Sequence, residues 1–93
     1  MKTKNYLKIL HVDHDVITPI YRQLADGILD GIDKGQIVKN DILPSLHDLC
    51  VAFNISKNTV EKAYFTLKQI GVVGSVKGKG FYVKATLLQS QVS

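Results

Sequence analysis

A short polar run in the second half of the chain combines residue types that recognise phosphates and base edges. The run Lys57-Asn58-Thr59 follows Ser56 at the start of a segment with helical periodicity. The first turn of a helix leaves backbone amides free, and its positive dipole end favours an anion such as phosphate. Lysine and asparagine side chains can also reach the hydrogen-bonding edge of a base in a DNA groove. The run therefore predicts a nucleic-acid contact.

Further residues complete the predicted contact set, and several of them have a purely structural alternative. They are Ser45, His47, Ser56, Glu61, Lys62, Lys77, Gly78, Lys79 and Gly80. For the two serines and Thr59 the alternative is helix capping, which satisfies the same amides. For Lys62 it is a solvated lysine, and for the two glycines it is the requirement of a tight turn. For Glu61 it is an intrahelical ion pair with Lys57.

Two short helices joined by a tight turn must hold these residues. Ser45 opens the first helix, Phe53-Asn54-Ile55 forms the break, and Ser56 opens the second helix. A break of this length sets two helices at a steep angle in a helix-turn-helix, whose second helix enters the DNA major groove. The predicted core of the pair consists of Leu49, Phe53, Val60, Ala63, Tyr64, Leu67 and Ile70.

A β hairpin is predicted directly after these helices. Gly71 ends the second helix, and residues 72–77 and 81–84 read as strands. Between them, Gly78-Lys79-Gly80 permits positive φ angles in a tight loop. A hairpin in this place is a wing, and its glycines let the backbone approach the minor groove closely.

The first half of the chain adds one more helix. Residues from Pro19 to about Lys34 place Ile20, Leu24, Ile28 and Ile32 on one face, with Thr18 as the predicted cap and Gly35 as a left-handed end. The glycines at 27 and 31 suggest close approach by another element, and Ile37-Val38 suggests a short strand. The expected fold class is α+β and mostly helical: a three-helix winged helix-turn-helix with a C-terminal β-hairpin wing. Residues 17–84 form the expected DNA-binding domain, 1–16 an N-terminal arm or short strand, and 85–93 a tail or the start of a linker.

Positive charge is concentrated in the predicted helix and wing. Residues 57–84 contain six of the 12 lysines and arginines but only one of the eight acids, and the whole chain carries a net charge of +4. Such a split between halves indicates a surface that binds a polyanion. No apolar run is long enough to span a bilayer, so no membrane partner is expected. The single cysteine, Cys50, fits a reducing compartment, and the cytoplasm is expected.

No combination of residues indicates catalysis. The run His11-Val12-Asp13-His14-Asp15 gathers four possible metal ligands, yet it lacks the spacing of known zinc patterns, and a solvated loop is predicted instead. A nucleophile–base pair, a phosphate loop and a dinucleotide fingerprint are all missing from the sequence. The expectation is a protein that is not an enzyme and uses no metal and no cofactor.

The combined pattern resembles the winged-helix DNA-binding domain of the GntR family of bacterial transcription regulators. The matching motifs are Leu43-Pro44-Ser45, Ser56-Lys57-Asn58-Thr59-Val60, Ala63-Tyr64 and Gly78-Lys79-Gly80-Phe81-Tyr82-Val83. The segment Pro19-Ile20-Tyr21-Arg22-Gln23-Leu24 resembles the first helix of the family, most closely in its YtrA-like branch. The resemblance implies a repressor that binds a palindromic operator in double-stranded DNA as a homodimer. It also implies an effector ligand, bound by a further domain of unknown class, which in some relatives is aminotransferase-like.

Two positions depart from the family pattern. His47 and Glu61 stand where many relatives carry arginine or another cation. Histidine carries little charge at neutral pH, and glutamate can accept a hydrogen bond from a cytosine amino group but cannot read guanine. The sequence preference is therefore expected to differ from that of the arginine-bearing relatives. The alternative function is a winged-helix module for protein–protein interaction, supported by an acidic face at Asp26, Asp30 and Asp33.

Overall fold

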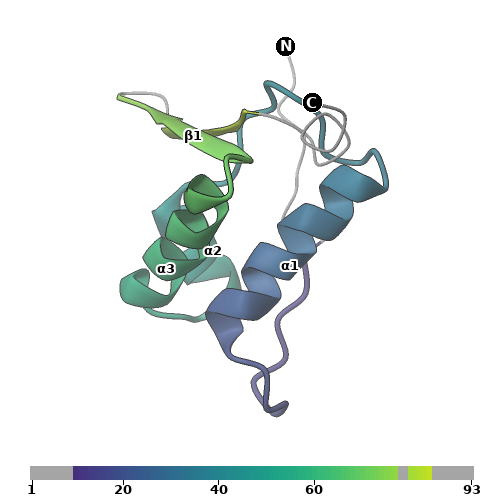
Figure 1. Ribbon diagram of the computed structural model, residues 1–93. Coiled ribbons are helices and arrows are strands. Elements are labelled where there is room, and N and C mark those ends of the chain that lie inside the picture. The colour runs from purple at the N-terminus through teal and green to yellow at the C-terminus, as the bar shows by residue number, and fades with distance from the viewer. Residues whose placement is uncertain (1–9, 78–79, 85–93) are drawn as a thin grey trace.

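The computed structural model describes residues 10–77 and 80–84 of the chain. Its elements are α1 (Ile20–Asp33), α2 (Leu46–Phe53), α3 (Lys57–Gln69), β1 (Val73–Val76) and β2 (Gly80–Val83). Both α1 and α2 pack against α3; in Figure 1, α2 lies behind α3, and the hairpin sits at the carboxyl end of α3. This arrangement confirms the α+β, three-helix winged helix-turn-helix.

The core lies where α1, α3 and the hairpin meet. The fully buried side chains include Leu24 and Ile28 from α1, Val60 and Leu67 from α3, and Val83 from β2. Burying an aliphatic side chain of this size contributes roughly 1.5–3 kcal/mol. The same apolar stripes that predict the helices therefore also hold them together.

The prediction that Ile70 belongs to the core is wrong. Ile70 is 51% exposed. The helical hydrogen bonding of α3 ends at Gln69, Ile70 is its C-cap, and Gly71 follows with φ +81°. The chain therefore leaves the helix at Ile70, whose side chain does not continue the packed stripe. Phe53, also expected in the core, is half-buried and packs against it.

The start of α1 differs from the prediction, and its end agrees with it. Pro19, not Thr18, occupies the N-cap position, and no side chain caps the helix there. The preceding loop is held instead by Gln23, whose Nε2 donates to the Thr18 carbonyl at 2.8 Å. At the other end Gly35 adopts φ +78° as expected. The amide of Gln36 then donates to the Gly31 carbonyl at 2.8 Å, a Schellman-type closure of the helix.

The chain before α1 packs along that helix, as Figure 1 shows. Leu10 is buried, and a Cβ added at Gly27 would lie 3.0 Å from the Leu10 Cδ2 atom. The close approach suggested by the glycine in α1 is therefore made by the N-terminal segment. Residues 10–12 form no strand. The rest of the predicted arm, residues 1–9, and the predicted tail, residues 85–93, lie outside the described residues.

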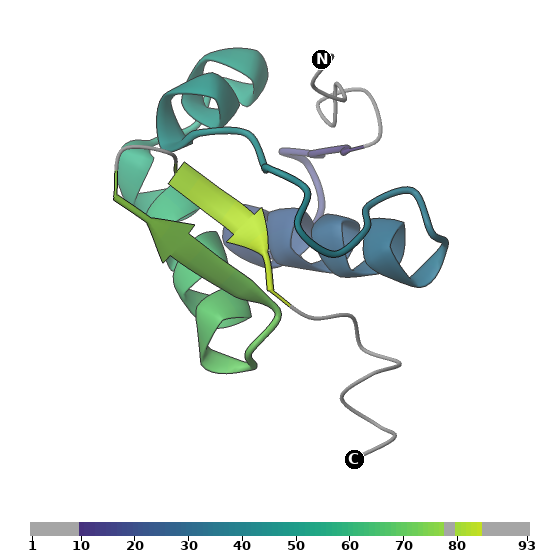
Figure 2. The same ribbon diagram turned by 90° about the horizontal axis from the view of Figure 1, so that it is seen from above.

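The hairpin pairs on both sides of β2. β1 and β2 run antiparallel with Val73 opposite Val83 and Val76 opposite Gly80. On the other edge of β2, the Leu43 amide donates to the Phe81 carbonyl at 2.9 Å, beside an isolated bridge between Ile42 and Tyr82. Figure 2 shows this connector passing beside the hairpin. The connector therefore ties the entrance of α2 to the wing.

The prediction of a short strand at Ile37-Val38 is wrong. The amide of Ile37 donates to the Gly31 carbonyl at 3.0 Å, and the amide of Val38 donates to the Asp41 carboxylate at 2.9 Å. Both amides are thus used by the helix end and a local turn. Ile37 contributes a fully buried side chain instead.

Candidate nucleic-acid interface

The helix-turn-helix is built from two capped helices and one left-handed residue. Ser45 and Asp48 form a reciprocal capping box: the Ser45 Oγ accepts from the Asp48 amide at 3.0 Å, and the Asp48 carboxylate accepts from the Ser45 amide at 3.4 Å. Asn54 ends α2 with φ 55° and ψ 54°. Asparagine tolerates this conformation better than most residues, which allows α3 to begin only three residues later. The three-residue break expected at 53–55 is present one residue later, at 54–56, because Phe53 is still the last residue of α2.

At the start of α3, some polar side chains hydrogen-bond within the helix and others do not. Ser56 Oγ accepts from the Thr59 amide at 3.2 Å and lies 2.8 Å from the Thr59 hydroxyl. The Ser56 hydroxyl therefore caps α3, and the Thr59 hydroxyl is bonded to that cap. Lys57 and Asn58, in the same turn, are exposed, and their side chains form no hydrogen bond or ion pair with other described residues. They remain free to bind a ligand.

Glu61 is not paired with Lys57. Within residues 10–77 and 80–84, the ion pairs join Arg22 to Asp26 at 3.4 Å and Lys34 to Asp30 at 3.0 Å. Both pairs lie on α1. The intrahelical pair considered as the structural alternative for Glu61 is therefore not formed, and its carboxylate stands exposed on α3.

His47 and Lys57 come together across the turn. With Leu46 and Cys50 they line a depression of about 340 Å³ between α2 and α3. His47 and Lys57 are both exposed. The structure thus joins two residues, ten apart in sequence, that were expected to contact the same ligand.

Tyr64 sets the position of α3 relative to its neighbours. Its hydroxyl donates to the Pro44 carbonyl, and its ring stacks on Phe81 of β2 with 4.2 Å between centroids and an interplanar angle of 17°. Burial raises the pKa of the Tyr64 phenol, and the Asp48 carboxylate raises it further, so the hydroxyl keeps its proton and remains a donor. One side chain therefore links α3 to the start of α2 and to the wing. The sequence identified Tyr64 only as core, because nothing local to it indicates its distant partners.

The wing carries part of the predicted set. Lys77 is exposed at the end of β1, and Gly80 begins β2 with φ +97°, in open space. The Lys68 ammonium donates to the Ser75 hydroxyl at 3.3 Å and so connects α3 to β1. Gly78 and Lys79 lie outside the described residues.

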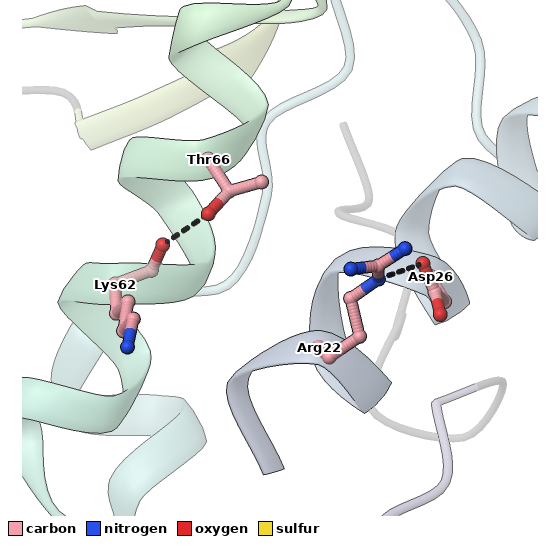
Figure 3. A network of polar contacts seen from close by, with 4 residues as sticks. All are labelled: Arg22, Asp26, Lys62 and Thr66. Atoms are coloured by element: carbon pink, nitrogen blue, oxygen red, sulfur yellow. Dashed lines mark hydrogen bonds and ion pairs between the residues drawn. The ribbon is translucent and has the colours of Figure 1, made fainter. Parts of the chain in front are cut away.

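Lys62 projects from α3 on the side that faces α1. Its ammonium lies over the Tyr21 ring, 4.3 Å from the centroid. Figure 3 shows Lys62 with its carbonyl accepting from the Thr66 hydroxyl at 2.9 Å, and the Arg22–Asp26 pair on the neighbouring α1. Sequence reasoning placed Lys62 in the contact set but gave no signal for its ring partner.

A family model described as "Bacterial regulatory proteins, gntR family" matches residues 20–83 of this fold. The chain belongs to the gntR family. It is 30% identical over 89 residues to the HTH-type transcriptional repressor YtrA of Bacillus subtilis, a match that covers 91% of this chain and 68% of that protein. It is 37% identical over 75 residues to the HTH-type transcriptional regulator YurK of the same organism, covering 81% of this chain and 31% of that protein. The chain thus spans from under a third to about two thirds of these relatives.

Solved structures carry the same fold. YtrA from Sulfolobus acidocaldarius, a GntR-family transcription factor, superposes with a TM-score of 0.76 at 33% identity, covering 90% of this chain and 88% of that one. The DNA-binding domain of AraR in complex with operator ORX1 gives a TM-score of 0.72 at 29% identity, covering 80% and 95%. Both YtrA proteins and YurK are named as transcription factors or transcriptional regulators. In the described residues, no helix is long and apolar enough to cross a membrane.

Proposed function

We propose that this chain is a sequence-specific DNA-binding transcriptional regulator that places α3 in the major groove and the wing, residues 72–84, alongside. The observation that carries this proposal is the exposed, unpaired polar surface of α3, where Lys57, Asn58, Glu61 and Lys62 stand free of ion pairs with other described residues. A surface held open in this way suits a ligand that supplies both phosphates and base edges.

Each face of the interface has its own task in this proposal. Lys57 and Asn58 reach base edges or phosphates from the first turn of α3, and Glu61 accepts from a cytosine amino group. The capped start of α2 at Ser45, with His47 two residues further on, meets the phosphate backbone on one side. Lys77, with Lys79 and the glycines of the wing tip, meets it on the other. Ser56 caps the Thr59 amide, and the remaining amides in the first turn of α3 face the same groove.

Assembly and control are extensions of the proposal. The relative named as the repressor YtrA favours repression, and a palindromic operator bound by a homodimer would present one α3 to each half-site. The domain proper spans residues 17–84, in agreement with the family match to 20–83. An effector ligand would act through a further domain, whether aminotransferase-like or of another class. A regulator of this kind works on bacterial DNA in the cytoplasm.

The competing function, a protein-interaction module built on the acidic face of α1, has weaker support. Two of the three carboxylates, Asp26 and Asp30, are already paired with Arg22 and Lys34. A paired carboxylate offers little net charge to a basic partner. Among the described residues, α3 and the wing carry exposed cations outside both ion pairs, including Lys57 and Lys77.

Fluorescence anisotropy with the full chain tests the proposal. Duplexes selected by the protein from a random-sequence pool should bind, and the logarithm of the binding constant should fall with the logarithm of salt concentration by about 0.9 per phosphate contact. Replacing the selected duplex with a scrambled one should weaken binding by roughly 10³-fold or more for a specific regulator. Failure to bind any duplex of the pool at low salt would refute it.

A further inference from the structure

Tyr21 of α1 lies outside every residue so far assigned to the interface, yet its ring touches the interface directly. The Lys62 ammonium sits 4.3 Å from the ring centroid, within the range of a cation–π contact. The same ring lines a depression of about 290 Å³ together with Pro19, Ile20, Asn58, Thr59 and Lys62. α1 and the first two turns of α3 therefore share one surface.

The partner of Lys62 is a ring and not a carboxylate, and this has a chemical consequence. Within residues 10–77 and 80–84, both ion pairs are internal to α1, and neither includes Lys62. A carboxylate would neutralise the ammonium and compete with phosphate for it. A ring attracts the ammonium on one side and leaves its other N–H donors available. The neighbouring Asp26 is held by Arg22, as Figure 3 shows.

We propose that Tyr21 is a positioning residue of the DNA interface, whose ring holds the Lys62 ammonium at the junction of α1 and α3 to receive one backbone phosphate. A lysine side chain loses rotamer entropy when it is fixed on a ligand. The ring removes part of that loss before DNA arrives. The inference rests on the proposed function and deepens it, since it assigns α1 a part in binding.

A double-mutant cycle between Tyr21 and Lys62 tests the inference, read by anisotropy on the selected duplex. Tyr21→Phe keeps the ring and should bind within about twofold of the wild type. Tyr21→Leu keeps an apolar body but removes the ring, and should bind about two- to fivefold more weakly, the size of an exposed cation–π contact. In a Lys62→Met background, Tyr21→Leu should have no further effect.

Lys62→Met itself should lower the salt slope by about 0.9, the value of one phosphate contact. Lys34→Met is the matched control: it also removes one lysine charge, but from the far end of α1, where the ammonium is paired with Asp30. Its salt slope should stay that of the wild type. An unchanged slope in Lys62→Met would overturn the phosphate assignment.

Other outcomes separate the possible failures. If Tyr21→Leu weakens binding equally with and without Lys62, Tyr21 acts only through the fold, and the inference is wrong. If Tyr21→Phe binds as weakly as Tyr21→Leu, the hydroxyl and not the ring is responsible, and the inference is again wrong. If the wild type binds no duplex, both the proposed function and the role of Tyr21 in DNA binding are wrong. In that case the Lys62 ε-methylene protons should still show the upfield NMR shift of a ring face, lost in Tyr21→Leu.

Discussion

α1 and α3 are neighbouring helices of nearly equal length, yet their exposed faces differ. α1 spans 14 residues and α3 spans 13, and each buries one apolar stripe against the other. On α1 and its C-cap, four exposed charges are joined in two i,i+4 pairs, Arg22–Asp26 and Lys34–Asp30, and Asp33 is exposed outside both pairs. On α3 the side chains of Lys57, Asn58 and Glu61 stand exposed and unpaired among the described residues.

The difference separates a surface that serves the fold from one that serves a ligand. Exposed i,i+4 pairs contribute a few tenths of a kcal/mol to a helix and complete its charge balance. Charges left without partners contribute nothing of this kind, and they remain available to phosphates and base edges. Substitutions of the paired charges on α1 should therefore change stability slightly and DNA affinity hardly at all, whereas substitutions of the unpaired polar side chains on α3 should do the reverse.

The largest effect is expected at Lys57. Lys57→Ala should weaken binding to the selected duplex by about 1–3 kcal/mol, roughly 5- to 150-fold, if the ammonium reads a base edge. The melting temperature should not change, because the side chain makes no contact in the described part of the chain. Lys34→Ala on α1 is the control and should keep wild-type affinity. Equal losses in the two variants would remove the distinction between the helices.

The two helix starts provide the next test. Ser56→Ala removes the side chain that caps α3 and should cost about 0.5–2 kcal/mol of unfolding free energy, measured by urea denaturation. Thr18→Ala, just before α1, should be neutral within about 0.5 kcal/mol, because no side chain caps that helix. A destabilised Thr18→Ala would show that the start of α1 depends on a cap after all.

The two tyrosines distinguish the helices in a third way. Tyr64→Phe deletes the hydroxyl that donates to the Pro44 carbonyl and should cost about 0.5–1.5 kcal/mol of stability. Tyr21→Phe on α1 removes a hydroxyl that makes no hydrogen bond to another described residue, and should leave stability unchanged. Thermal unfolding of both variants checks the difference. Similar losses in the two would mean that the Tyr64 hydrogen bond contributes nothing particular.

The smallest effect is expected from the acids. Asp30→Asn should cost no more than about 0.5 kcal/mol by breaking its pair with Lys34, and it should leave DNA binding unchanged. Glu61→Gln should leave stability unchanged but alter the base preferred in the selected duplex, because an amide presents a different hydrogen-bonding pattern. Repeating the duplex selection with Glu61→Gln checks this. An unchanged preference would exclude Glu61 from base recognition.

Local sequence signals predicted what depends on neighbours along the chain. Ser45 and Ser56 predict the starts of two helices, because a capping side chain acts within three residues. Gly35 and Gly71 predict the ends of two helices, because glycine readily adopts a positive φ there. The motif positions led to the winged helix and to the family for the same reason. The apolar period located most of the core, with the exception of Ile70.

Contacts between distant segments were not predictable in this way. The Tyr64–Pro44 hydrogen bond spans 20 residues, and the Lys62–Tyr21 contact spans two helices. The pairing of β2 with the connector was not predicted. In the connector, the amides of Gln36 and Ile37 bond the end of α1, and the later Leu43 amide bonds β2, a division that the local sequence does not indicate. Such partners depend on how the helices pack, which periodicity does not specify.

The most direct test of the central claim is an amide NMR titration of the ¹⁵N-labelled full chain with the selected duplex. The largest shift changes should fall on Lys57, Asn58, Lys62 and Lys77, with small changes along residues 26–33 of α1. Changes concentrated on residues 26–33, with α3 and the wing unaffected, would contradict the assignment of α3 as the DNA-binding surface.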